Sequence, residues 1–186
     1  MMKKRIYSLV LGTGLILGSS QALAAEMEDV VNPDSELYDT TRVMEEIEYD
    51  LTDDAGDQAL LQDGYAVERV AESELALESG DVELAEDLLE EANESTDQAE
   101  ADLNDAIETE DESVEEVEKT LAESLEARTM KLRTFLDRED LPEQAKIGIS
   151  RALKQVGMVV KRAEERTVLQ TKLAAGELTE EEFESE

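Results

Sequence analysis

Apolar residues recur at every third or fourth position along this chain, and that spacing fits helices rather than strands. Clusters of β-branched and aromatic residues are sparse, and aromatic residues make up only 3% of the sequence. Short polar turns separate the long amphipathic stretches, which favours antiparallel packing of neighbours along the chain. We therefore predict an all-α domain, built as an antiparallel bundle of about five amphipathic helices with coiled-coil-like packing.

Each predicted helix carries an apolar stripe that we expect to face the core. The first stripe consists of Leu37, Thr41, Met44, Ile47 and Leu51. The second consists of Leu60, Gly64, Val67, Ala71 and Leu75. The third consists of Leu84, Ala85, Leu88, Leu89, Ala92, Ala99, Leu103, Ala106 and Ile107. The fourth consists of Val114, Val117, Leu121, Leu125, Leu132, Phe135 and Leu136. The fifth consists of Ile149, Ala152, Leu153, Val156, Val159, Val160, Ala163, Val168, Leu169 and Leu173.

Capping residues predict where several of these helices begin and end. Asp53 or Asp54 can cap the second helix, and Asp81 the third. Gly80 can supply the left-handed conformation that ends the second helix. Pro142 is favoured as the first residue of the fifth helix. Within that helix, residues 148 and 157 are both glycine, which destabilises a helix interior, so we expect close helix contacts there.

The charge of the chain is large, negative and unevenly distributed. The formal net charge is −33, and residues 25–118 hold 36 acidic residues but only two basic ones, Arg42 and Arg69. Between Arg128 and Lys172, basic residues outnumber acidic ones by 11 to six. The basic C-terminal helices can pack beside the acidic ones and partly neutralise them, or they can form a separate anion-binding face. So acidic a chain is not expected to bind nucleic acid or anionic membranes.

The N-terminus has the three parts of a secretory signal peptide. Met1–Arg5 is basic, residues 6–17 are mostly apolar, and Ala22-Leu23-Ala24 forms a cleavage site. We predict cleavage after Ala24 and export to the periplasm or the cell exterior, with no membrane insertion of the mature chain. Removing residues 1–24 takes away three basic groups and leaves 162 residues at a net charge of −36. We assign residues 25–34 to an exposed N-terminal segment, 35–175 to a helical domain and 176–186 to an acidic C-terminal tail.

The sequence offers little to support catalysis. It contains no His and no Cys, which removes the usual ligands of zinc and haem and two common nucleophilic systems. Ser150 and Lys154 lie four residues apart, as a Ser–Lys dyad would, but we expect a surface pair beside the core stripe. Residues 50–57 look like a loop around Gly56, yet they fail the EF-hand ligand pattern. We predict no catalytic, cofactor-binding or metal-ligating residue, and only weak, diffuse binding of divalent cations such as calcium.

Several segments together resemble a known group of proteins. They are Asn32–Tyr38, the helix Ala66–Glu91 with its Gly80-Asp81 end, and Leu121–Gly157, which contains Leu141-Pro142-Glu143-Gln144-Ala145-Lys146 followed by an Ile-x-x-Ala-Leu helix. This pattern, from about Pro33 to Gly157, resembles an uncharacterised bacterial family of exported helical domains, a domain of unknown function. The resemblance implies a five-helix extracytoplasmic domain and supplies no catalytic or binding residues.

These observations favour a non-enzymatic, exported, acidic helical protein that binds or scaffolds an unidentified protein partner. A basic partner would complement its negative charge. Its acidity would suit a saline or cation-rich surrounding, because negative charge keeps a protein hydrated in salt. Two alternatives stay open at this point. One is a low-affinity divalent-cation buffer or sensor, and the other is a regulatory interaction domain of an envelope signalling system.

Overall fold

The structure, a computed structural model, describes residues 30–109 and 113–177. Its helices are α2 (Tyr38–Leu51), α3 (Ala55–Ser79), α4 (Val82–Glu108), α5 (Val114–Leu136) and α6 (Glu143–Ala174). The described ranges contain no strand. The predicted all-α bundle of about five helices is therefore confirmed. The predicted signal peptide, residues 1–24, and the predicted tail from residue 178 onward lie outside the described residues.

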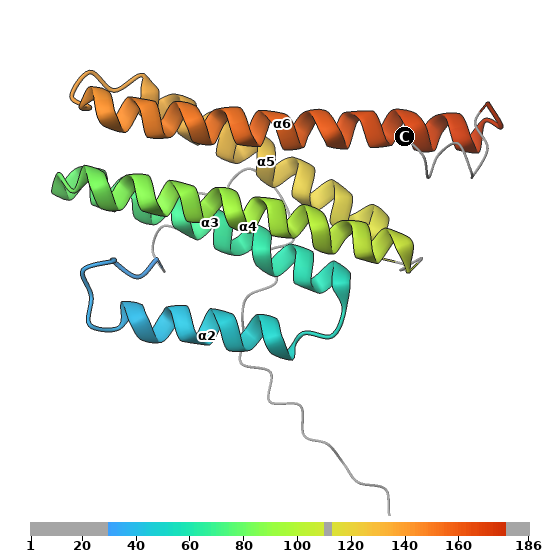
Figure 1. Ribbon diagram of the computed structural model, residues 1–186, viewed down its shortest axis with the longest axis horizontal. Coiled ribbons are helices and arrows are strands. Elements are labelled where there is room, and N and C mark those ends of the chain that lie inside the picture. The colour runs from blue at the N-terminus through green and yellow to red at the C-terminus, as the bar shows by residue number, and fades with distance from the viewer. Residues whose placement is uncertain (1–29, 110–112, 178–186) are drawn as a thin grey trace, which may run out of the picture.

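Helices α3 to α6 form the body of the bundle, and α2 lies along one side of it. In Figure 1, α6 lies along one side of the molecule and α2 along the opposite side, with α3, α4 and α5 between them. The most extensive contact joins α3 to α4, whereas α2 makes its main contact with α3. Within the described ranges, no helix is both long enough and apolar enough to cross a bilayer.

The predicted caps define the helix ends between α2 and α4. The Asp54 carboxylate accepts a hydrogen bond from the backbone N–H of Asp57 at 2.9 Å, and Asp81 caps α4 in the same way. Gly80 has a φ of 85°, the left-handed conformation that ends α3. Pro142 was expected inside α6 but stands just before it, because its ψ of 148° is extended and helical geometry begins at Glu143.

Two clusters of buried apolar side chains fill the bundle. The larger joins α3, α4, α5 and α6 around Leu88, Leu132 and Ile149. The smaller lies between α3, α4 and α5 around Leu103 and Leu121. The predicted stripes of α4 and α5 are buried or half-buried throughout, and that of α6 is too, except for its exposed Val168.

The predicted stripe of α3 is displaced from the buried face of that helix. Of its five members only Ala71 is buried. Ala59, Ala66 and Val70 are buried instead. The buried face of α3 also includes charged residues, which a search for apolar spacing alone overlooks.

The predicted apolar stripe of α2 faces solvent instead of the core. Leu37, Met44, Ile47 and Leu51 were expected to face the core, but each is between 51% and 76% exposed, and α2 has no buried residue. Its inner side is formed by tyrosine, arginine and glutamate side chains that meet polar groups of α3 and α4. The bundle of α3–α6 already buries its own apolar faces, so α2 packs against it through polar contacts.

One of the two glycine contacts predicted in α6 is present. A Cβ atom at Gly148 would lie 2.9 Å from Cγ of Glu86, so this glycine allows α6 to approach α4 closely. The prediction for Gly157 is wrong, because nothing lies within 4 Å of the position its Cβ would take.

Basic residues of α5 and α6 pair with acidic residues of α3 and α4, as one of the two charge hypotheses predicts. Lys131 on α5 lies 3.0 Å from Glu74 on α3. Arg162 on α6 lies 2.5 Å from Glu100 on α4. The acidic half of the chain is therefore partly neutralised by the protein's own C-terminal helices.

Candidate protein-interaction site

A buried arginine on α3 holds the inner side of α2. The Arg69 side chain is fully buried and lies 2.7 Å from Glu45 on α2 and 3.1 Å from Glu72 on its own helix. The Tyr38 hydroxyl on α2 donates a hydrogen bond to Glu72 at 3.0 Å and accepts one from Arg69 at 3.4 Å. Each of these groups is therefore engaged by another through a hydrogen bond or an ion pair, and the contact between α2 and α3 is polar rather than apolar.

A second arginine extends this contact to α4. Arg42 on α2 lies 2.8 Å from Glu45 and 2.5 Å from Glu91 on α4. Further along α2, the Tyr49 hydroxyl donates to Asp102 of α4 at 3.1 Å. We call these contacts of Arg42, Arg69, Tyr38, Tyr49 and their acidic partners the α2 seam.

Apolar spacing did not reveal the α2 seam, but two sequence signals could have. Arg42 and Arg69 are the only basic residues between positions 25 and 118, and both belong to the seam. Tyr38, Arg42, Glu45 and Tyr49 follow one another at spacings of four and three, which places them on one helix face. A rare cation in an acidic segment is therefore a good marker of a structural contact.

Two seam carboxyl groups, those of Glu45 and Glu72, retain their protons at higher pH than free carboxyl groups. Burial raises the pKa of Glu45 to about 8, and Glu68 and Glu72 add to the rise although Arg42 opposes it. Burial likewise raises the pKa of Glu72 to about 7, against the hydrogen bond from Tyr38 and the charge of Arg42. Docking of α2 onto α3 is therefore favoured at mildly acidic pH.

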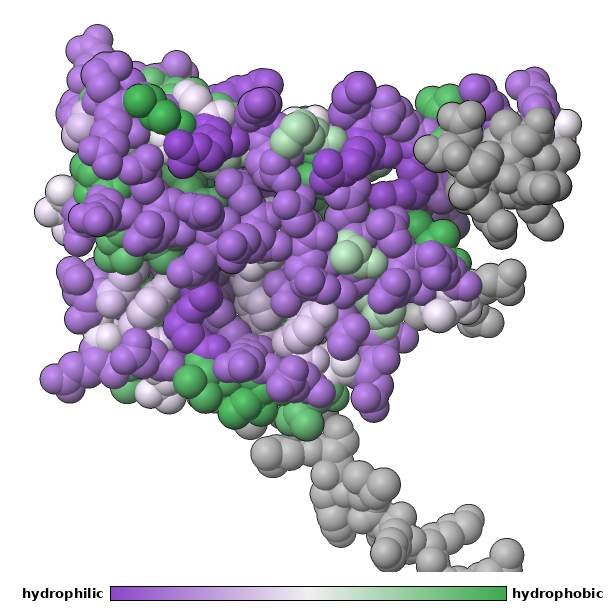
Figure 2. Space-filling view, viewed as in Figure 1, coloured by the Kyte–Doolittle hydropathy of each residue, from purple (hydrophilic) through white to green (hydrophobic). Residues whose placement is uncertain are grey.

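The outer side of α2 presents an apolar surface to solvent. Leu37, Val43, Met44, Ile47 and Leu51 form it, and all are more than half exposed. We call these five side chains the α2 ridge. In Figure 2 apolar side chains gather along the lower edge of the molecule, where Figure 1 places α2. Contiguous exposed apolar side chains of this kind are typical of interaction surfaces.

Acidic side chains border the α2 ridge. Asp39, Glu46 and Asp50 lie to one side of it on the helix and Glu48 to the other, and all four are exposed. An apolar surface with a negative border is complementary to an amphipathic segment that carries basic residues beside its apolar ones.

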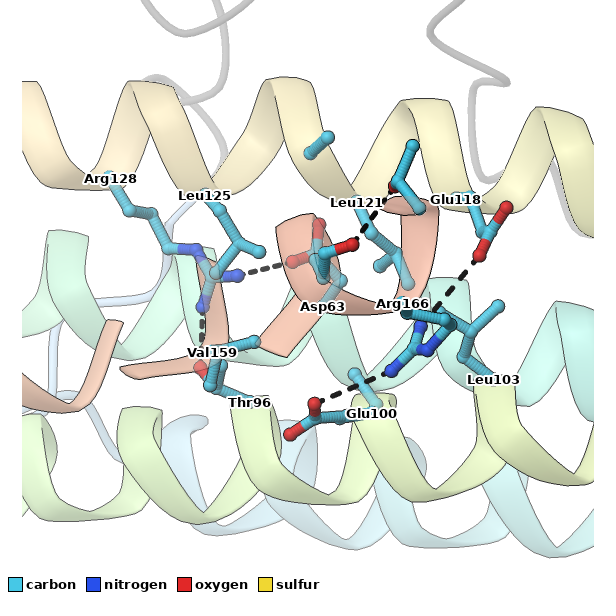
Figure 3. A pocket seen from close by; sticks show the side chains of 14 residues that line it. Asp63, Thr96, Glu100, Leu103, Glu118, Leu121, Leu125, Arg128, Val159 and Arg166 are labelled. Carbon is cyan, nitrogen blue, oxygen red and sulfur yellow. Dashed lines mark hydrogen bonds and ion pairs between the residues drawn. The ribbon is translucent and has the colours of Figure 1, made fainter. Parts of the chain in front are cut away.

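A small cavity lies in the middle of α3–α6, away from α2. Its volume is about 110 Å³, and Leu103, Leu121, Leu125 and Val159 supply apolar walls. Figure 3 shows two arginines pointing into this region from different helices.

The charged groups around the cavity are paired with one another. Arg128 donates to the Asp63 carboxylate and, at 2.6 Å, to the Thr96 hydroxyl. Arg166 lies 3.5 Å from Glu100 and 3.8 Å from Glu118 (Figure 3). These pairs join α3 to α5 and α4 to α6, so we assign them to holding the bundle together.

The other residues considered from the sequence lie apart from the α2 seam. The exposed Ser150 hydroxyl donates to the Lys146 carbonyl at 2.7 Å, so it is engaged with the backbone. Gly56, expected in a loop, lies in the first turn of α3, because Asp54 starts that helix. Among the residues that the structure describes, no three acidic side chains converge as a metal site would require.

Fold and surface together define an all-helical domain with an exposed apolar face on one outer helix. The chain belongs to the family described as Domain of unknown function (DUF5667), which matches residues 30–128. The match covers α2, α3, α4 and most of α5, whereas the predicted signature Leu141–Lys146 lies beyond it and stays a prediction. No curated protein and no solved structure matches the chain.

Proposed function

We propose that this protein is a non-enzymatic, exported interaction domain whose α2 ridge binds a helical protein segment with apolar and basic side chains. The observation that carries the proposal is the orientation of α2: five apolar side chains are exposed while the polar side of the same helix faces the bundle. Exposing these side chains to water is unfavourable, so a partner that covers them gains the free energy of their burial.

The acidic border of the α2 ridge selects the charge of the partner. A segment with lysine or arginine beside its apolar residues would meet Asp39, Glu46, Glu48 and Asp50, whereas an acidic segment would be repelled. The ridge spans the 15 residues from Leu37 to Leu51, about 21 Å of helix, which matches about four turns of a partner helix.

The remaining parts of the proposal rest on composition. The absence of His and Cys and the pairing of charged side chains around the cavity favour binding over catalysis. The basic, apolar and Ala-x-Ala pattern of residues 1–24 supports export. The net charge of −33 supports a saline setting, because salt screens the repulsion among carboxylates.

A peptide titration tests the binding proposal. The probe is a fluorescent amphipathic helical peptide whose polar face carries lysine, compared by anisotropy with the same peptide carrying glutamate instead. We expect the lysine peptide to bind and Ile47→Asp to weaken it at least tenfold. Met130→Asp is the control, since Met130 on α5 is 56% exposed and Ile47 is 51% exposed. Equal binding of both peptides, or equal weakening by both substitutions, would contradict the proposal.

Melting followed by circular dichroism across a sodium chloride series tests the saline setting. We expect the melting temperature to rise with salt, because screening removes repulsion that is stronger in the compact state than in the unfolded chain. A melting temperature that stays constant or falls would contradict salt adaptation.

A further inference from the structure

The outer face of α6 carries an exposed row of side chains that the bundle does not use. Ile147 is 59% exposed and Met158 is 40% exposed. Arg151, Lys154 and Lys161 are also exposed, and the spacing of these five residues by three and four places them on one helix face. We call these five side chains the α6 ridge.

The basic groups of the α6 ridge are not used to neutralise the rest of the molecule. Neither Arg151 nor Lys154 forms an ion pair with any residue in the described ranges, and Lys161 pairs only with Glu165 of its own helix, at 3.2 Å. By contrast, Arg162 and Arg166 on the same helix turn toward α4 and pair with Glu100. In a chain of net charge −33, cations left at the surface beside exposed apolar side chains indicate a surface suited to an acidic, apolar partner.

The α2 ridge and the α6 ridge are complementary in chemistry and in length. The first is an apolar row with an acidic border, and the second is a row in which three basic side chains alternate with the apolar Ile147 and Met158. Both span 15 residues, Leu37–Leu51 and Ile147–Lys161, so each is about 21 Å long. They lie on helices at opposite sides of the molecule, so one copy cannot bring its own two ridges together (Figure 1).

We propose that the α2 ridge of one copy docks on the α6 ridge of a second copy, so that the protein associates with itself head to tail. This inference rests on the proposed function of the α2 ridge and names a second copy of the chain as its partner. The contact is heterologous, so each added copy leaves one ridge of each kind free, and the product is a ring or an open chain of subunits.

The association is weak and depends on salt. One pair of helices in contact over about 21 Å buries less than the roughly 800 Å² per partner of a stable interface. Two copies of the mature chain, each of net charge −36, also repel each other at a distance, and only the contacting ridges attract. At about 1 M salt the Debye length is about 3 Å, so the long-range repulsion is screened while the apolar contact persists. Association therefore strengthens from low to high salt.

Sedimentation velocity of the mature chain, up to about 1 mM protein in about 1 M sodium chloride, tests the inference. We expect a concentration-dependent rise in sedimentation coefficient that Ile47→Asp and Met158→Asp each abolish. Met130→Asp and Lys119→Glu are the controls, because both residues are exposed on α5. Circular dichroism confirms that each variant folds.

Mixing the two variants that should not self-associate, Ile47→Asp and Met158→Asp, gives the most specific test. Ile47→Asp keeps an intact α6 ridge and Met158→Asp keeps an intact α2 ridge, so an equimolar mixture should form dimers that grow no further. Association of Met158→Asp alone would indicate contact between two α2 ridges and would overturn the inference. A wild-type chain that stays monomeric also overturns it, and binding of the lysine peptide to that monomer would leave the proposed function standing.

Discussion

Replacing Arg69 with methionine should release α2 from the bundle without unfolding the other helices. Arg69 is fully buried and contacts Glu45, Glu72 and Tyr38 at 2.7, 3.1 and 3.4 Å. Methionine keeps much of the volume but leaves two buried carboxyl groups without their cation. Above about pH 8, where both carboxyl groups are ionised, loss of one partner from a buried ion pair costs about 3–5 kcal/mol, which corresponds to a hundredfold or greater change in an equilibrium constant.

The loss of stability should be confined to α2 because of the way α2 is attached to the bundle. No residue of α2 is buried, and the two apolar clusters have no buried member from it, so undocking α2 frees the unpaired carboxyl groups and leaves the core of α3–α6 intact. The substitution should therefore lower the stability of α2 far more than that of α4. The cost should also be smaller at about pH 5 than at about pH 8, because Glu45 and Glu72, with pKa values raised to about 8 and about 7, are then protonated.

Amide hydrogen exchange measured by mass spectrometry distinguishes these outcomes. Above about pH 8 we expect the protection of the α2 amides to fall at least a hundredfold, or to the level of an undocked helix, while protection in α4 changes less than threefold. Lys119→Met is the control, since that side chain is 74% exposed. Unchanged protection in α2, or an equal fall in α2 and α4, would refute the role assigned to Arg69.

Three further predictions concern the titration of the seam, the cavity and the helix contacts. The folded protein keeps a proton on Glu72 up to a pKa of about 7, so the free energy of unfolding should fall as pH rises from about 5 to about 8. Glu72→Gln should make this fall with pH shallower in urea unfolding measurements. An unchanged pH dependence would contradict the raised pKa. Arg128→Met should destabilise all of α3–α6 by about 3–5 kcal/mol in the same assay, because it leaves the buried carboxylate of Asp63 unpaired, and a loss under 1 kcal/mol would contradict this. Gly157→Ala should stabilise the chain by about 1 kcal/mol, whereas Gly148→Ala should gain less or destabilise it, because only the latter places its Cβ against α4; equal thermal shifts would show that the close approach is unimportant.

The bundle could be predicted because its helices follow local rules. Aspartate caps at positions 54 and 81, the left-handed Gly80 and the apolar rows of α4 and α5 are each sufficient to locate an element. The basic C-terminal helices also pair with the acidic ones as opposite charges predict.

The orientation of α2 could not be predicted from its own pattern. A search for amphipathic helices turns the row Leu37–Leu51 inward, because burial of apolar area is the usual stabilising term. Here the groups that need partners are on α3, where burying Arg69 and Glu72 requires Tyr38 and the carboxylate of Glu45 on α2. The candidate interaction site arises from this reversal, and it becomes visible only once α2 and α3 are placed together.

Methyl NMR of the chain with the lysine peptide tests the central claim, that the exposed face of α2 is a protein-binding surface, most directly. The α2 ridge contains leucine, valine, methionine and isoleucine, all of which carry methyl groups that can be labelled. We expect the methyl signals of Val43, Met44 and Ile47 to shift on addition of peptide, while those of the buried Leu88 and Leu132 do not. Shifts confined to α5 or α6, or no shifts at peptide concentrations of about 1 mM, would contradict the claim.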